Sequence, residues 1–248
     1  MSRMIAVYGS PDAGKTTFAM KMALEIYAMQ NCTVIYISSD LRIPSLPILF
    51  PRRKNTELYS LGAALESPEV TENTILSAIN TPKGQSNFGC LGYKAGENVY
   101  TYPSLTEDKI IALFTIVRNL ADYIVVDCTC DPDDLLSVMA LDSADLPLRL
   151  ISPDLKSMAY FASQMPLYLS RGINVENHAI VLNTPNADLY MPDEAVKKHF
   201  SNIVASIPYS RRVKLQMLEG EVPQMVSDNA YRKIMRNFVQ KEVLSKWQ

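Results

Sequence analysis

The stretch Gly-Ser-Pro-Asp-Ala-Gly-Lys-Thr at residues 9–16 decides the fold of this chain. It matches the pattern G-x-x-x-x-G-K-[ST], in which a glycine-rich turn and the start of a helix cradle phosphate groups. The apolar run at residues 4–8 predicts a buried strand before this turn. Apolar side chains at helical spacing predict a helix over residues 17–29 after it. This strand–loop–helix context favours a phosphate-binding loop over a chance glycine turn.

Such a loop binds the phosphates of a nucleotide by defined chemistry. Backbone N–H groups of the turn and of the helix N-terminus point at the β-phosphate, and the helix dipole adds to their attraction. We expect the Lys15 ammonium to reach the β- and γ-phosphates and the Thr16 hydroxyl to bind Mg²⁺. The predicted nucleotide contacts of the loop are Gly9, Ser10, Pro11, Asp12, Ala13, Gly14, Lys15, Thr16 and Thr17.

Two aspartates follow predicted strands, where open α/β sheets place their ligands. Asp127 ends the apolar strand at residues 123–126 and is predicted to hold Mg²⁺, directly or through water. The alternative is an aspartate that only ends a strand. Asp40 follows the strand at residues 33–38 and is a candidate to orient an attacking water or to meet Mg²⁺. Because Ser-Ser-Asp is also good capping chemistry, a cap of a helix or turn is an equal alternative for Asp40.

The composition is that of an ordinary globular protein. Of 248 residues, 48% are hydrophobic and 20% are charged, which excludes disordered and fibrous classes. A total of 24 Lys and Arg against 26 Asp and Glu argues against a dedicated electrostatic nucleic-acid binder. Four scattered cysteines, including the pair Cys128 and Cys130, lack the partners of a metal site, so we expect reduced thiols. The first residues are too short an apolar stretch for a signal peptide, and we expect a cytoplasmic protein.

Strands and helices are predicted to alternate along the chain, which is typical of an α/β fold with a mostly parallel central sheet flanked by helices. We expect one domain over residues 1–248. Strands are predicted at residues 4–8, 33–38, 123–126, 148–152, 179–183 and 203–207. Helices are predicted at residues 17–29, 57–65, 69–79, 106–120, 155–169 and 228–247.

The order of these motifs resembles the ParA/MinD superfamily of P-loop ATPases, and within it most closely the CpaE/TadZ-like branch. The likeness covers nearly the whole chain and is weakest between residues 45 and 105. It rests on the loop, on Asp40 and on the runs Tyr123-Ile-Val-Val-Asp127, Ser152-Pro-Asp-Leu155, Ile180-Val-Leu-Asn183 and Ile207-Pro-Tyr-Ser210.

The resemblance implies a role for each matching position. Lys15 and Thr16 match the phosphate and magnesium residues, and Asp127 matches the Walker B aspartate. Asp40 matches the second acidic residue of a D-x-D motif that positions the hydrolytic water. Asn183 looks like the asparagine that contacts adenine, and Pro208 belongs to the segment that packs near the base. The resemblance further implies ATP and Mg²⁺ as cofactors, and a homodimer that holds ATP between its subunits.

The chain departs from the family pattern at the loop. Ser10 stands where the family has a signature lysine that reaches the partner subunit's nucleotide. Pro11 and Asp12 replace two glycines, and Ser38 replaces the first acidic residue of the D-x-D motif. Pro11 offers no N–H group and Asp12 adds a negative charge near phosphates. These departures favour nucleotide binding over efficient turnover.

Three functions remain open on sequence grounds. The first is an ATPase that positions a cellular cargo, such as a pilus or secretion apparatus or a plasmid-type partition complex, by recruitment to a membrane or cell pole. The second is a scaffold with a degenerate ATPase, and the third, less favoured, is a small-molecule kinase or synthetase. The amphipathic C-terminal helix suits a membrane surface but is more typical of core packing. Local basic clusters are similarly more typical of solvated surface than of non-specific DNA binding.

Overall fold

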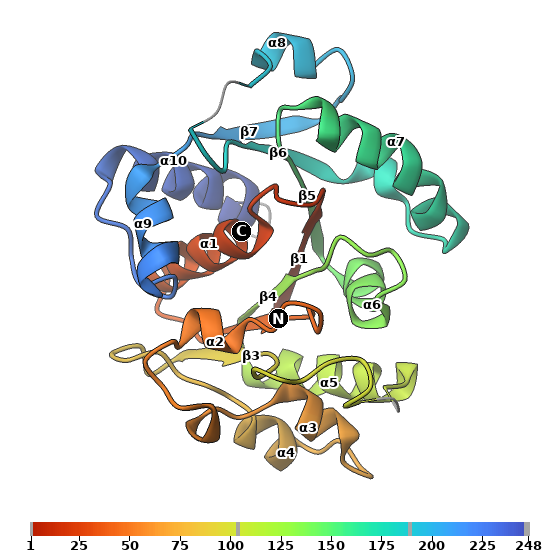
Figure 1. Cartoon of the computed structure of the whole chain (residues 1–248), viewed down its shortest axis with the longest axis vertical. Coiled ribbons are helices and arrows are strands. Elements are labelled where there is room, and N and C mark those ends of the chain that lie inside the picture. The colour runs from red at the N-terminus through yellow and green to blue at the C-terminus, as the bar shows by residue number, and fades with distance from the viewer. Residues whose placement is uncertain (1, 103–104, 188–189, 246–248) are drawn as a thin grey trace.

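The computed structural model describes residues 2–102, 105–187 and 190–245. At its centre is a seven-stranded sheet in the order β3-β2-β4-β1-β5-β6-β7, in which every neighbouring pair is parallel. This confirms the predicted α/β fold (Figure 1). The strands are β1 (Arg3–Gly9), β2 (Val34–Ser38), β3 (Phe88–Leu91), β4 (Tyr123–Asp127), β5 (Leu146–Ile151), β6 (Ala179–Asn183) and β7 (Ile203–Ile207).

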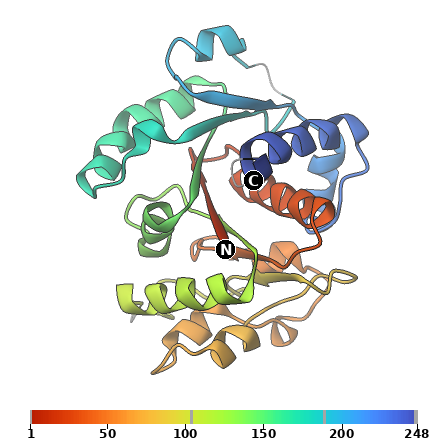
Figure 2. The same cartoon turned by 180° about the vertical axis from the view of Figure 1, so that it is seen from behind.

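Helices cover both faces of the sheet. Figures 1 and 2 show α1, α9 and α10 together on one face, and α5, α6 and α7 on the other. The α-helices are α1 (Lys15–Met29), α2 (Leu46–Leu49), α3 (Leu61–Glu66), α4 (Glu72–Ser77), α5 (Glu107–Leu120), α6 (Leu135–Ser143), α7 (Leu155–Ser170), α8 (Asp193–Val196), α9 (Arg211–Glu219) and α10 (Asn229–Phe238). Short 3₁₀ turns lie at Asn55–Glu57 and Val175–Asn177, and a π-helical turn at Val239–Leu244 continues α10.

The central strand β1 explains why an unbroken apolar run forms a strand here. Successive side chains of a strand point to opposite faces, and both faces of a parallel sheet are covered. Ile5 and Val7 accordingly pack in the core on the α1 side, whereas Met4, Ala6 and Tyr8 pack in the core on the α7 side. All five are fully buried. The loop after β1 is therefore anchored to a buried strand at the centre of the sheet.

The C-terminal helix packs on α1. Its buried stripe consists of Tyr231, Met235 and Phe238, and the Phe238 ring meets Phe18 of α1 edge-on with centroids 5.6 Å apart. Core packing thus accounts for the amphipathic pattern. Trp247, at the end of the predicted helix, lies outside the described residues. None of the helices in the described part of the chain has the length and apolar composition needed to span a membrane.

The region between residues 45 and 105 differs most from the prediction. Residues 88–91 form the edge strand β3, which sequence analysis missed because four residues give too short a pattern. The helices predicted at 57–65 and 69–79 are shorter than expected. They begin after Ser60 and Thr71, whose hydroxyl groups accept the backbone N–H three residues further on and so set the helix starts.

Helices α6 and α9 were not predicted, nor were the four-residue helices α2 and α8. Both α6 and α9 begin at a side-chain cap: Asp134 accepts from the Ser137 N–H, and Ser210 accepts from the Val213 N–H. The exposed helix α9 has nine residues, is mostly polar and buries only Val213, so it gives no long apolar pattern. Its position matters for the site described next.

Candidate nucleotide-binding site

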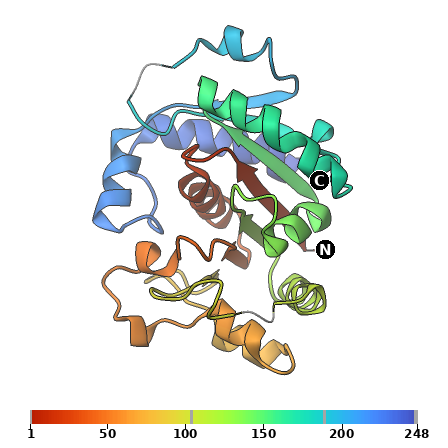
Figure 3. The ribbon, with the colours of Figure 1, turned by 45° about the vertical axis from the view of Figure 1, so that its right-hand side comes forward.

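A cavity of about 520 Å³ lies at the carboxyl ends of the central strands, beside the start of α1. Figure 3 shows the loop from β1 to α1 between α9 and α7. In an open parallel sheet this is where the strand order reverses and where ligands bind. The predicted site residues that line the cavity are Pro11, Asp12, Gly14, Lys15, Thr16, Thr17, Asp40, Asp127, Asn183 and Pro208. Of the remaining predicted contacts, Gly9, Ser10 and Ala13 are buried behind the wall.

The two glycines of the loop are required by close approaches. A Cβ atom at Gly9 would lie 2.2 Å from the main-chain oxygen of Leu150, because β5 runs beside β1 at this point. Gly14 has φ +81°, in the left-handed region that favours glycine, and a Cβ there would lie 2.7 Å from Asn183 Nδ2. The loop therefore has the tight shape in which backbone N–H groups can converge on a phosphate.

Asn183 holds this loop from behind. Its Nδ2 atom donates a 2.7 Å hydrogen bond to the main-chain oxygen of Ala13. Asn183 comes from the end of β6 and is only 8% exposed. The Asn183 side chain therefore both lines the cavity and fixes the position of the loop at Ala13.

Lys15 and Ser10 are linked within the loop. The Lys15 Nζ atom donates a 3.0 Å hydrogen bond to the main-chain oxygen of Ser10. The Ser10 hydroxyl is fully buried and hydrogen bonds to the Ser157 hydroxyl of α7, so it faces away from the cavity. The position at which the resemblance would place a signature lysine is occupied here by a small side chain packed against α7.

Asp127 is the buried carboxylate of the site. It is 3% exposed, and its Oδ2 atom accepts a 2.8 Å hydrogen bond from the Tyr36 hydroxyl. Burial raises the pKa of Asp127 to about 6, opposed by the nearby Thr16 hydroxyl, Tyr36 and Lys15. Its Oδ1 atom is buried without a hydrogen-bond partner among the described residues.

These groups fit a magnesium ion. Mg²⁺ prefers oxygen ligands and is bound by one or two carboxylates together with substrate phosphates. The orphaned Oδ1 atom of Asp127 and the Thr16 hydroxyl beside it offer such oxygens at the cavity wall. The described residues contain no cluster of three or more His, Cys, Asp or Glu side chains that would hold a metal alone. A magnesium ion here would depend on the nucleotide.

Asp40 serves as a turn cap and also faces the cavity. Its Oδ1 atom accepts 2.9 Å hydrogen bonds from the backbone N–H groups of Arg42 and Ile43. The capping alternative is thus present in the structure. Asp40 also lines the cavity, so its second oxygen can still serve a ligand.

Asp12 stands at the mouth of the cavity with φ +60°. Its Oδ2 atom lies 2.6 Å from the Lys156 ammonium of α7, and both side chains are largely exposed. This lysine holds the pKa of Asp12 below its ordinary value. The negative charge that the loop carries is therefore paired before any phosphate arrives.

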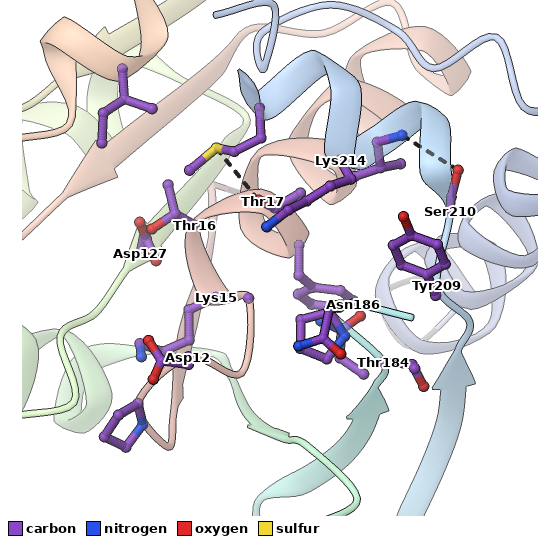
Figure 4. Close-up of a pocket in the computed structure, with 18 of the residues that line it drawn as sticks. Asp12, Lys15, Thr16, Thr17, Asp127, Thr184, Asn186, Tyr209, Ser210 and Lys214 are labelled. Carbon is purple, nitrogen blue, oxygen red and sulfur yellow. Dashed lines mark hydrogen bonds between the residues drawn. The ribbon is translucent and has the colours of Figure 1, made fainter. Parts of the chain in front are cut away.

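The far wall of the cavity contains residues that sequence analysis missed. They follow the end of β6 or lie on α9, namely Thr184, Pro185, Asn186, Lys214 and Met217. Tyr209 lines the cavity too, and it belongs to the segment 208–211 that the resemblance placed near the base. Figure 4 shows several of these side chains facing the loop across the cavity. The end of β6 was a usable signal for Thr184, Pro185 and Asn186, because ligand contacts follow parallel strands. Lys214 and Met217 lie on the helix that was not predicted.

The cysteines next to the site are free thiols. Cys128 and Cys130 both line the cavity. Burial raises the pKa of the Cys128 thiol well above its ordinary value. A neutral thiol is a poor nucleophile and a poor metal ligand, which is consistent with an inert role.

No protein-family model and no curated protein matches this sequence. Solved structures do. The chain is similar to the ParA family ATPase from Chlorobium tepidum TLS over 96% of its length and 98% of that chain, with 17% identity and a TM-score of 0.77. It is similar to the septum site-determining protein MinD of Pyrococcus horikoshii OT3, complexed with Mg-ADP, over 99% and 98% of the two chains, with 17% identity and a TM-score of 0.73. The chain has the ParA/MinD fold.

A third structure with the ParA/MinD fold is a putative plasmid partition protein from Borrelia burgdorferi B31 bound to AMPPNP. It covers 97% of this chain and 98% of its own, with 16% identity and a TM-score of 0.73. Two of these three proteins thus carry an adenine nucleotide or its analogue. None of the three is a CpaE or TadZ protein, so the likeness to that branch rests on sequence alone.

Proposed function

We propose that this protein binds Mg-ATP in the cavity and uses it as a switch. The observation that carries the proposal is the pairing of a complete phosphate-binding loop with the buried, unpartnered Asp127 oxygen beside Thr16. A buried carboxylate oxygen without a partner costs free energy unless a ligand completes it. Nucleotide-bound relatives by fold support the same ligand class.

The residues of the chain suggest how the nucleotide is bound. The Lys15 ammonium, which donates a hydrogen bond to the main-chain oxygen of Ser10, moves a short way to bind the β- and γ-phosphates. Asp127 and Thr16 hold the magnesium ion, which neutralises charge on the phosphates. Hydrolysis, where it occurs, uses the free oxygen of Asp40 to orient a water for in-line attack on the γ-phosphate. Turnover is expected to be weak, because Ser10 is buried against α7 and supplies no cation.

The wider function follows from the switch. We propose an ATP-dependent homodimer that positions a cellular cargo, either a pilus or secretion apparatus or a plasmid-type partition complex. The fold supports this class, since structures of partition and septum-site proteins share it. The proposal places the protein in the cytoplasm, with recruitment to a membrane or cell pole.

Light scattering tests the switch directly. The molar mass is measured without nucleotide, with Mg-ADP and with a slowly hydrolysed Mg-ATP analogue, and the Lys15→Ala variant serves as the control. A dimer that forms only with the ATP analogue, and not in the variant, supports the proposal. The same mass in all states, in a wild type that binds the analogue, contradicts the dimer switch and leaves nucleotide binding standing.

The second candidate is a nucleotide-binding scaffold without hydrolysis. The burial of Ser10 favours it, because the loop lacks the cation that would act across a dimer. A phosphate-release assay separates the two. Turnover that Asp40→Asn abolishes supports the ATPase, and tight binding without phosphate release supports the scaffold.

A further inference from the structure

Helix α9 forms the wall of the cavity that faces the phosphate-binding loop. It contributes Val213, Lys214 and Met217. The Met217 sulfur accepts a 4.0 Å hydrogen bond from the Thr17 hydroxyl, which joins this wall to the start of α1. Figure 4 shows the Lys214 side chain reaching from α9 into the cavity, toward the start of α1.

Lys214 differs from two other lysines near the phosphate-binding loop. Lys15 donates to the Ser10 oxygen and Lys156 pairs with Asp12. Within the described ranges, the Lys214 ammonium has no hydrogen bond or ion pair with the protein. It therefore presents an uncompensated positive charge to a cavity whose opposite wall is a phosphate-binding loop.

The position of α9 relative to the loop is set by a buried contact. Lys21 of α1 is 2% exposed, and its Nζ atom donates to Gln216 Oε1 of α9 at 2.7 Å. The same ammonium donates to the main-chain oxygens of Val222 and Gln224 at 2.7 and 2.8 Å, in the segment after α9. Because α1 also carries the loop, Lys21 ties α9 and the loop to one helix.

We propose that Lys214 is a second phosphate-binding cation of this site and contacts the α-phosphate of the bound nucleotide. The inference rests on the proposed nucleotide binding. Lys15 and Thr16 serve the β- and γ-phosphates, and Thr17 is one residue further from the turn. A cation that lies beside Thr17 is therefore expected to contact the next phosphate toward the ribose, which is the α-phosphate. A lysine serves there as a compact point charge, whose contact with phosphate is charge-assisted.

The test is equilibrium binding by calorimetry, with ADP and adenosine as the probes. Lys214→Met keeps most of the side-chain volume and removes the charge, and Lys214→Arg keeps the charge. Arg212→Met removes an exposed charge from the same helix, outside the cavity wall, and is the matched control. Lys214 is exposed, so all three variants are expected to unfold at the wild-type temperature.

Lys214→Met is expected to weaken ADP binding about tenfold, with adenosine binding unchanged, because the lost contact is to phosphate. Lys214→Arg should restore ADP affinity, and Arg212→Met should match the wild type. Equal ADP affinity in wild type and Lys214→Met overturns the role of Lys214 alone. Equal losses for ADP and adenosine overturn the phosphate contact. A wild type that binds no nucleotide overturns the proposed function and this inference together.

Discussion

The side-chain amide of Asn183 donates a 2.7 Å hydrogen bond to the main-chain oxygen of Ala13, so the end of β6 holds the phosphate-binding loop in place. The family resemblance assigned Asn183 to the adenine base. The observed bond gives it a second role that does not depend on the base. A buried carbonyl that loses its donor costs about 1–3 kcal/mol.

Asn183→Ala is therefore expected to lower the free energy of unfolding and to weaken nucleotide binding through the loop. Support for the loop is common to all nucleotides, so affinities for ADP and GDP should fall by the same factor. Denaturant unfolding and calorimetry with both nucleotides measure the two effects. A loss confined to ADP would assign Asn183 to the base instead of the loop.

Removing the charge of Asp12 and removing the charge of Lys156 should change nucleotide affinity in opposite directions. Asp12→Asn removes a negative charge near the phosphates and keeps a residue type that tolerates positive φ, so ATP-analogue affinity should rise several-fold. Lys156→Met leaves the Asp12 charge uncompensated and should lower the affinity for the ATP analogue. The double variant removes one charge of each sign from the same place, so its affinity should resemble that of the wild type. Equal affinity in all four proteins, at low salt, would show that this pair lies outside the reach of the phosphates.

The raised pKa of Asp127 predicts how stability depends on pH. The native carboxyl titrates near pH 6, whereas an ordinary aspartate titrates near 3.8, so between these values the native state binds more protons. The free energy of unfolding therefore falls as pH rises through that window. Above pH 6 the native state bears the full cost of a buried, ionised Asp127, and Asp127→Asn removes this cost. Without nucleotide, the variant should be more stable than wild type at pH 7.5, on the order of 2–3 kcal/mol, and equal at pH 3.5.

Magnesium binding should become stronger as pH rises, because it uses the ionised form of Asp127. Mg²⁺ needs the ionised carboxylate, so the extra ADP affinity conferred by Mg²⁺ should decline below about pH 6 and be absent in Asp127→Asn. The terminal phosphate of ADP also titrates near pH 6, so ADP binding without metal over the same pH range is the control that gives the ligand's own contribution. A magnesium effect that persists in Asp127→Asn would place the ion elsewhere.

The buried Lys21 predicts a contribution to stability that depends on pH. Lys21→Met leaves the Gln216 and Val222 oxygens without their donor, so it should lower the free energy of unfolding. Burial lowers the pKa of Lys21 to about 7, so the charged side chain is costly below that pH and the loss should be smallest there. Between pH 7 and 10 the native state binds fewer protons than the unfolded chain. Wild type should thus gain stability relative to the variant over this range.

Local order around α9 should fall as well. Lys21→Met removes the donor that holds Gln216 and the segment after it, so amide hydrogen exchange in residues 213–226 should become faster. Lys233→Met, an exposed change on α10, is the control. Unchanged exchange in this segment would mean that α9 is positioned by its apolar contacts alone.

Much of the site could be predicted from sequence, because its chemistry is local. The loop, the strand before it and Asp127 follow from spacing and apolar runs, and the structure brings them to one cavity. Sequence also showed that Ser10 replaces a lysine. It could not show that Ser10 faces Ser157, since that contact joins residues 147 positions apart.

The other omissions have the same physical origin. Helix α9 is short, mostly polar and buries Val213 alone, so its sequence gives little signal. Its contact with Lys21 of α1 joins residues 195 positions apart. The edge strand β3 gains its strand character from pairing with β2. Such elements are specified by tertiary contacts, which a linear pattern does not contain.

The contact between Phe18 and Phe238 makes the packing of α10 on α1 part of the folding stability of the protein. Phe18 belongs to the first turns of the helix that begins at the phosphate-binding loop, and α10 covers it. A lipid bilayer that captured the apolar stripe of α10 would have to take it from this core. Lipid binding and folding stability would then compete, so vesicles that bound this helix would lower the melting temperature, and bound nucleotide would weaken the attachment.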